Sequence, residues 1–213
     1  MLSTKARIIH LKNNNYYKKV RIEIQPKKCR HILDEHIAEQ NTVWDARMKF
    51  RMNLVDSYIS GNRKELSEHE ELITVIGRYI LDYIDWPAKY PQYIETLEYV
   101  ESLENTKVKY KRKSITFLCK NGLQIIASII KKKSEKKPTY SITTAYFPIK
   151  VNRQESDYRL FLRSRRNLKK KYNKKIIEDK KHKLKRNILK CKFVSNEHWE
   201  KPSDINEYLG VEK

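Results

Sequence analysis

The chain has 213 residues and a formal net charge of +21, because its 47 Lys and Arg residues outnumber its 26 Asp and Glu residues. This length fits one domain with a long appendage, or two small domains. The four glycines argue against Gly-rich phosphate loops. No run of about 18 apolar residues predicts a membrane span, and no apolar signal-peptide region is visible. The isolated cysteines Cys29, Cys119 and Cys191 favour a reduced, cytoplasmic setting. We therefore expect no membrane partner.

The positive charge is unevenly distributed along the chain. Residues 31–105 carry fifteen acidic and seven basic residues, whereas the segments on both sides are strongly basic. An AT-rich genome would enrich any protein in Lys, Asn, Ile and Tyr, but that bias would not place an acidic block between two basic segments. The pattern therefore favours a polyanionic partner, above all nucleic acid.

The first half of the chain predicts a strand followed by helices. "VRIEIQP" (20–26) alternates in polarity and ends in proline, which is typical of a strand. Residues 27–40 and then 42–61, 67–86 and 92–104 follow a helical period. The apolar stripes of the first and third of these helices are Cys29, Ile32, Leu33 and Ile37, and Leu72, Ile76, Ile80 and Ile84. We interpret residues 41–105 as a helical insertion.

The pattern changes to strands after residue 106. In "SITFLCKNGLQIIASII" (114–130), two β-branched runs are separated by Asn121-Gly122, the strongest short hairpin signal. "TYSITTAYF" (139–147) predicts a third strand. Alternation would place one set of its side chains on one face, Ile142, Thr144 and Tyr146, and the other set opposite, Ser141, Thr143 and Ala145. The predicted fold class is therefore α+β, a small antiparallel meander packed by the N-terminal helix.

The segment after Pro148 predicts a basic helix. Its apolar residues recur in one helical stripe: Phe161, Leu168, Tyr172, Ile176, Leu184 and Ile188. A solvated tail is the alternative interpretation. We divide the chain into an α+β domain, 1–150, and a basic, partly helical extension, 151–213, in which Arg163, Arg165 and Arg166 are candidate contacts to a polyanion.

Two histidines lie close together in "KKCRHILDEHIAEQ" (27–40). A helical zinc pair needs histidines four residues apart, but His31 and His36 are five apart, which leaves them roughly 140° apart around an α-helix. We therefore expect the side chains to diverge and to form no metal site. His36 lies within the apolar arc, either as a core histidine or aimed at the adjoining sheet. Asp34 and Glu35 lie on the far face, where we expect them to be solvated.

The helix with "RHILDEH" and the meander ending in "TTAYFP" together resemble the barnase–EndoU–colicin–RelE superfamily of ribonucleases. The resemblance is to phage-borne and toxin members with an N-terminal "HI…H" helix and a C-terminal "TAYP" strand, and it covers residues 20–40 and 110–150. The chain departs from that pattern at Phe147, which stands between Tyr146 and Pro148. The resemblance implies RNA as partner, either tRNA or mRNA, and an inhibitor or antitoxin protein as a second partner.

The resemblance implies RNA cleavage that uses neither metal nor cofactor. The ribose 2′-hydroxyl attacks its own phosphate and leaves a 2′,3′-cyclic phosphate and a 5′-hydroxyl, which requires a base, an acid and donors to the phosphate. His31 and His36 are the implied acid–base groups, because histidine titrates near neutral pH. The implied contacts to phosphate or base are Arg30, Thr144 and Tyr146, with Lys113, Lys120 and Thr143 as further candidates.

Two other functions fit the same sequence. The first is a non-catalytic nucleic-acid binder that uses the basic C-terminal segment for phosphate contacts. The second is a protein-interaction module whose acidic helical block binds a basic partner. RNA scission without divalent ions is expected of the ribonuclease alone.

Overall fold

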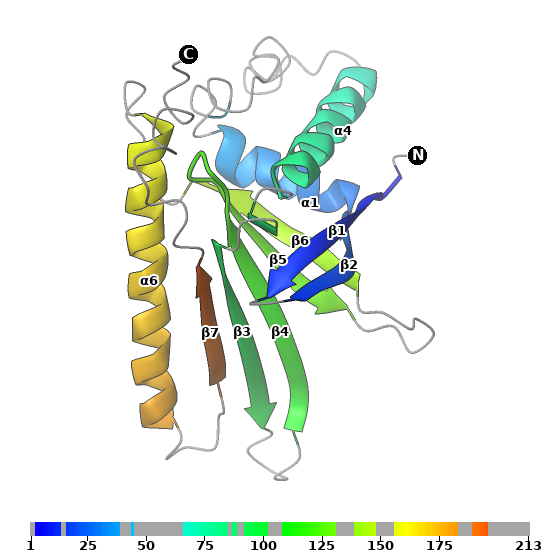
Figure 1. Cartoon of the computed structure of the whole chain (residues 1–213). Helices are drawn as coiled ribbons and strands as arrows, with labels where there is room; N and C mark the ends of the chain where they lie inside the picture. The colour runs from blue at the N-terminus through cyan, green and yellow to red at the C-terminus, as the bar shows by residue number, and fades with distance from the viewer. Residues whose placement is uncertain are drawn as a thin grey trace.

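The computed structural model describes residues 3–13, 16–38, 44, 66–84, 87–88, 92–101, 108–130, 139–147, 156–182 and 189–195. These residues form an α+β fold, as predicted, with one seven-stranded sheet (Figure 1). The strands are β1 (Lys5–Asn13), β2 (Tyr16–Ile24), β3 (Gln92–Glu101), β4 (Val108–Leu118), β5 (Gln124–Ile130), β6 (Thr139–Tyr146) and β7 (Leu189–Ser195). The helices are α1 (Pro26–Ile32), its π-helical continuation η1 (Leu33–Ile37), α4 (Leu66–Tyr83) and α6 (Asp157–His182).

The strand order is β1-β2-β6-β5-β4-β3-β7. The predicted meander is confirmed as β4, β5 and β6, which pair antiparallel in chain order. The sheet is larger than predicted, and it is mixed, because β2 pairs parallel to β6. At the predicted hairpin turn, Gly122 has φ +85°, and a Cβ there would lie 2.6 Å from Leu160 Cγ of α6. Glycine is therefore required both by the turn and by the helix that packs on it.

The central strands have one buried face and one more open face. The buried face is here called the inner face, and six of its side chains are at most 1% exposed: Ile115, Phe117, Ile125, Ala127, Ile142 and Ala145. The β1–β2 hairpin adds Ile9, Leu11, Val20 and Ile22 to the same core. Tyr93 Oη of β3 donates to the Lys12 carbonyl of β1 at 3.1 Å, although β1 is an edge strand and four strands lie between it and β3. The sheet is therefore curled, and Figure 1 shows the hairpin crossing in front of the central strands.

Helices α1 and α4 close this core. The predicted stripes are confirmed, since all four apolar side chains of each are buried. A Cβ on Gly77 of α4 would lie 3.2 Å from Cys29 Sγ of α1, so the two helices approach closely at this glycine. In addition, Arg7 Nη1 of β1 forms an ion pair with Asp82 Oδ1 of α4 at 2.7 Å. Among the described residues, no helix has the length and apolarity needed to cross a membrane.

The predicted helical insertion is partly wrong. Residues 92–101 form β3, which pairs with β4 on one side and β7 on the other. The spacing of Tyr93, Leu97 and Val100 fits a helix, but pairing with distant strands outweighs such a local preference. The predicted helix at 42–61 lies outside the described residues except for Trp44. The Trp44 indole is buried and meets the Phe147 ring edge-on at 5.4 Å, so the residue that interrupts "TAYP" is a core residue.

The segment 151–213 contributes both a helix and a strand. Phe161 and Leu168 of the predicted stripe are buried and cluster with Leu118 of β4, and Tyr172 is half-buried. Leu184 and Ile188 lie outside the described residues, as does the side chain of Ile176. The helix α6 ends at His182, and β7 then joins the sheet at the free edge of β3. This part of the extension is therefore continuous with the sheet of the first 150 residues.

Candidate functional site

The helix that carries the two histidines changes from α to π geometry between them. The Ala38 amide donates to the Leu33 carbonyl, five residues back instead of four. This extra residue per turn brings positions five apart to the same side of the helix. The His31 and His36 rings are therefore in T-shaped contact, with centroids 5.6 Å apart. The expectation that they diverge by roughly 140° is wrong, because it assumed a regular α-helix.

A β-bulge in β6 determines which side chains meet these rings. Ile126 of β5 pairs with Thr144, but the next residue, Ala127, pairs with Ile142, so Thr143 is the extra residue. Ile142 consequently lies with Ala145 on the inner face, and the predicted grouping of Ile142 with Thr144 is wrong. Thr144 and Tyr146 lie on the opposite side of the sheet, here called the outer face.

Four side chains form the candidate site, from α1, η1 and β6. His36 Nε2 lies 2.9 Å from Thr144 Oγ1, a hydrogen bond whose donor depends on the ring's protonation. The His36 ring lies 5.4 Å from the Tyr146 ring, tilted by 41°. His31 is exposed, whereas His36, Thr144 and Tyr146 are half-buried. The group is thus held by packing and hydrogen bonding yet open to a ligand from the His31 side.

A fifth side chain comes from α6. Lys171 Nζ donates to Tyr146 Oη at 3.3 Å and lies 5.7 Å from the centroid of the Tyr146 ring. Lys171 is exposed, so its ammonium is available to an anion while it contacts the phenol. The order along the site is therefore His31, His36 with Thr144, Tyr146, and Lys171. Lys171 could not be singled out from the sequence, because nothing in the spacing of α6 indicates which lysine contacts β6.

Seven other residues were predicted to belong to the site, and they lie on several different elements of the fold. Arg30 is exposed on α1, and Lys120 is exposed in the β4–β5 turn. Side chains alternate along β4, so Lys113 lies on the inner face with Ile115, whereas Thr144 lies on the outer face. The Thr143 hydroxyl donates to the Ile126 carbonyl at 3.0 Å. On α6, Arg163 and Arg165 are half-buried and Arg166 is exposed.

A buried amide lies beside the site. Gln124 of β5 pairs directly with Tyr146 across the strands, so the two side chains share the outer face. Gln124 is fully buried, and neither its Nε2 nor its Oε1 has a hydrogen-bond partner among the described residues. In the sequence, Gln124 stands out as a polar residue at the start of a largely apolar strand, two positions after Gly122.

Acidic and thiol groups contribute little to the site. Asp34 and Glu35 are exposed, as predicted. Burial raises the pKa of Cys29 to about 12 and also raises the pKa of Cys119, so neither thiol is a ready nucleophile. No three His, Cys, Asp or Glu side chains in the described ranges are grouped as metal ligands would be.

Comparisons of this chain with protein-family models, with curated proteins and with solved structures find no match. The function must therefore be argued from the geometry of the site and from the charge around it.

Proposed function

We propose that this protein is a metal-independent endoribonuclease, a toxin or phage-encoded RNA cleaver, that leaves 2′,3′-cyclic phosphate ends. The observation that carries the proposal is the contact between two imidazoles, one of which is held by a threonine hydroxyl: the His31 and His36 rings 5.6 Å apart, and His36 Nε2 2.9 Å from Thr144 Oγ1. Two imidazoles this close to each other can act on one phosphodiester, one as the base and the other as the acid.

The proposed reaction needs one neutral and one protonated imidazole. The neutral ring takes the proton of the ribose 2′-hydroxyl, and O2′ then attacks the adjacent phosphorus. The bond from phosphorus to O5′ breaks, and the protonated ring gives its proton to that oxygen. Thr144 holds His36 in a fixed orientation, as a positioning partner does. His31, which is more exposed, is the ring that can approach the departing strand.

The extra negative charge on the phosphate requires donors. Lys171 places an ammonium next to Tyr146 Oη, and because the phenol accepts from the lysine, its own proton can be donated to an anion. A cation and a hydroxyl in this arrangement can bind the two non-bridging phosphate oxygens. Arg30, exposed next to His31 on α1, is a further candidate contact to the phosphate.

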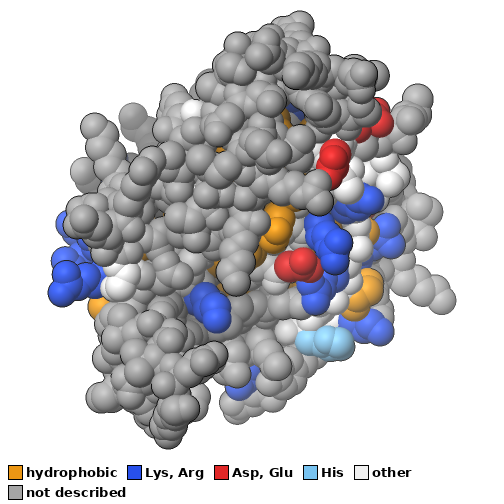
Figure 2. Space-filling view, turned by 90° about the horizontal axis from the view of Figure 1, so that it is seen from above, with side chains coloured by type: hydrophobic (Ala, Val, Ile, Leu, Met, Phe, Trp, Pro, Cys, Tyr) orange, Lys and Arg blue, Asp and Glu red, His pale blue; other side chains and the backbone are white. Residues whose placement is uncertain are grey.

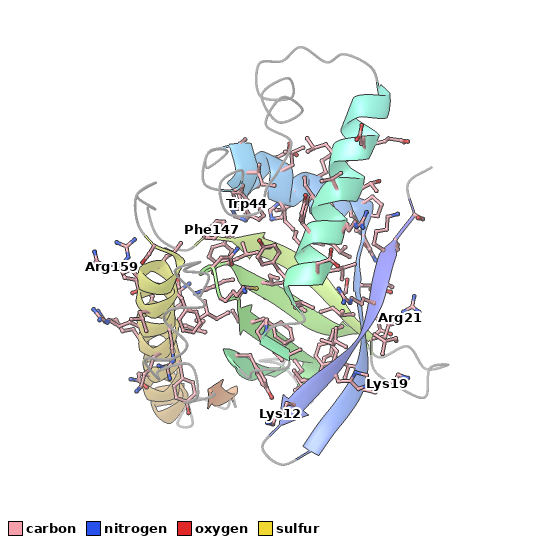
Figure 3. The ribbon with its side chains drawn as sticks, turned by 45° about the horizontal axis from the view of Figure 1, so that its top comes forward. Lys12, Lys19, Arg21, Trp44, Phe147 and Arg159 are labelled. Carbon is pink, nitrogen blue, oxygen red and sulfur yellow. The ribbon has the colours of Figure 1, made fainter. Side chains whose placement is uncertain are left out.

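A binding-only protein is the second candidate function, and one observation favours it. Six basic side chains of α6 are exposed, which is more than a five-residue site requires: Arg159, Arg166, Lys169, Lys170, Lys171 and Lys174. Figure 3 shows Arg159 projecting from α6 away from the sheet. Such a helix can bind a phosphate backbone whether or not the strand is cut.

One experiment separates the two functions. Purified protein is incubated with total RNA in excess EDTA, and the ends of the fragments are mapped. The ribonuclease produces cyclic phosphates and 5′-hydroxyls, and the His31→Ala and His36→Ala variants produce far fewer of both. Intact RNA that is nevertheless retained by the protein would show that binding is the whole function.

A further inference from the structure

The basic N-terminal hairpin is not used by the site described above. In the β1–β2 ladder, His10 is opposite Lys19 and Ile8 is opposite Arg21. These four side chains therefore share one face, the hairpin outer face, while their neighbours in the sequence point into the core. All four are exposed: Ile8 is 47% exposed, and the Arg21 side chain 54%. Ile8 is the one exposed large hydrophobic residue in the described part of the chain.

The hairpin outer face is positively charged. Lys12 continues the row of His10 on β1, and Lys19 and Arg21 form the row on β2. The one carboxylate in these rows, that of Glu23, is almost fully buried and lies 3.8 Å from the Arg21 guanidinium. Figure 3 shows Lys19 and Arg21 projecting outward from β2. The face is therefore cationic, with an apolar residue and an imidazole between its charges.

Protection of the sheet edge does not explain all of these charges. Lysines on an edge strand do prevent pairing with another chain, and β1 is such an edge. However, Arg21 is paired on both sides, with Ile8 of β1 and with Thr139 of β6. Arg21 therefore protects no free edge.

This face is also separate from the candidate site. The hairpin lies at the β1 end of the sheet, whereas α6, which supplies Lys171, packs against β7 and β4. In Figure 2, Lys and Arg side chains gather at two opposite sides, one where Figure 1 places β1 and β2 and one where it places α6. The hairpin outer face and the basic surface of α6 are therefore two separate surfaces.

We propose that the hairpin outer face is a second nucleic-acid-binding surface, which holds the phosphate backbone of single-stranded RNA through Lys19 and Arg21. His10 supplies a flat ring on which a base can stack, as rings in single-strand-binding grooves do, and Ile8 supplies an apolar contact to a sugar or base. The inference goes beyond the proposed function, because a protein that binds RNA without cutting it would use this surface equally.

The test compares charge reversals on and off this surface. The K19E/R21E variant is compared with Arg78→Glu, which reverses an exposed charge on α4. Binding of a fluorescent 30-nucleotide single-stranded RNA is measured by anisotropy at several salt concentrations. We expect K19E/R21E to bind at least about ten-fold more weakly and to reduce the slope of log K against log salt by about 1.4, roughly 0.7 for each lost phosphate contact. Arg78→Glu should change affinity less than about three-fold.

Two further measurements keep the result clear. Cleavage of a dinucleotide, which is too short to reach the hairpin, should be the same in K19E/R21E and in the wild type. If neither protein cuts the dinucleotide, the ribonuclease proposal fails while the binding comparison still stands.

If K19E/R21E melts at a lower temperature, K19Q/R21Q replaces it, with an expected three- to five-fold loss of affinity. Affinity and salt slope equal to those of Arg78→Glu would overturn the proposal, as would a salt-resistant dimer that hides this face.

Discussion

His36 Nε2 and Thr144 Oγ1 lie 2.9 Å apart, although 108 positions separate the two residues in the chain. Two local irregularities produce this contact. The π-helical turn rotates His36 toward the side of His31, and the bulge at Thr143 returns Thr144 to the outer face of the sheet. π-turns and bulges both interrupt regular hydrogen bonding and are frequent at functional sites. Their convergence at one hydrogen bond is the strongest structural reason to look for chemistry here.

The first prediction concerns the two imidazoles. His31→Ala and His36→Ala should each lower kcat/KM for a fluorescent RNA in EDTA by roughly 100-fold or more, because each variant loses a general acid or base. Thr144→Val and Tyr146→Phe should lower it less, since each removes a hydrogen bond and keeps the shape of the side chain.

Glu35→Ala is the control for these variants, because Glu35 is exposed on the same π-helical turn. It should stay within about two-fold of the wild type, as surface substitutions usually do. Each protein is also melted thermally. Near-normal activity in both histidine variants would refute the mechanism, and a lowered melting temperature in His36→Ala alone would identify His36 as a core histidine.

The second prediction concerns Lys171. If its ammonium stabilises charge on the phosphate, Lys171→Gln should lower kcat by about 10-fold, less than a buried donor would because the lysine is exposed to solvent. Lys169→Gln removes the same charge from the same helix and should raise KM without lowering kcat. Equal effects of the two substitutions on both constants would show that Lys171 acts only through general attraction to RNA.

Much of the fold could be predicted from short-range signals. Pro26 marks the end of β2 and the start of α1, and Asn121-Gly122 marks the β4–β5 turn, because each residue type has a strong backbone preference. The strand β3 could not be predicted, since its pattern fits a helix and its pairing partners, β4 and β7, lie far along the chain. The strands β1 and β7 could not be predicted for a different reason, since both lie at edges of the sheet and carry charged side chains.

The candidate site could be predicted as a set of residues but not as a geometry. The stripe of Cys29, Ile32, Leu33 and Ile37 is buried equally well in an α-helix and in a helix with one π-turn, so periodicity does not distinguish the two. Alternation along β6 likewise assumes a regular strand and cannot locate the bulge at Thr143. The first error separated His31 from His36, and the second grouped Ile142 with Thr144 instead of with Ala145.

The third prediction concerns the buried amide beside Tyr146. Gln124 is fully buried with both polar atoms unpartnered among the described residues, and such a group lowers stability. Gln124→Leu keeps the volume and removes the amide, so it should raise the free energy of unfolding by about 1–2 kcal/mol in urea titrations. Gln124→Ala should lower it, because a cavity remains. A loss of stability in the leucine variant would instead show that the amide is satisfied by water or by another part of the chain.

The last prediction uses the buried thiols. Burial raises the pKa of Cys29 from 9.0 to about 12 and raises that of Cys119 as well, so above pH 9 the unfolded chain loses protons that the folded chain keeps. The free energy of unfolding should therefore fall as the pH rises through the window from 9 to 12, by about 1.4 kcal/mol per pH unit for each thiol. Below pH 9 the thiols are protonated in both states, so they add no pH dependence to the free energy of unfolding.

Cys29→Ala and Cys119→Ala are measured by urea titration at pH 8 and pH 10. Each variant should lose less free energy of unfolding between these two pH values than the wild type does. Loss of the same size in all three proteins would mean that other groups, such as lysines, cause the alkaline instability. Residue-resolved alkylation at pH 8 is the independent check, because both thiols should react slowly in the native protein and rapidly once it is unfolded.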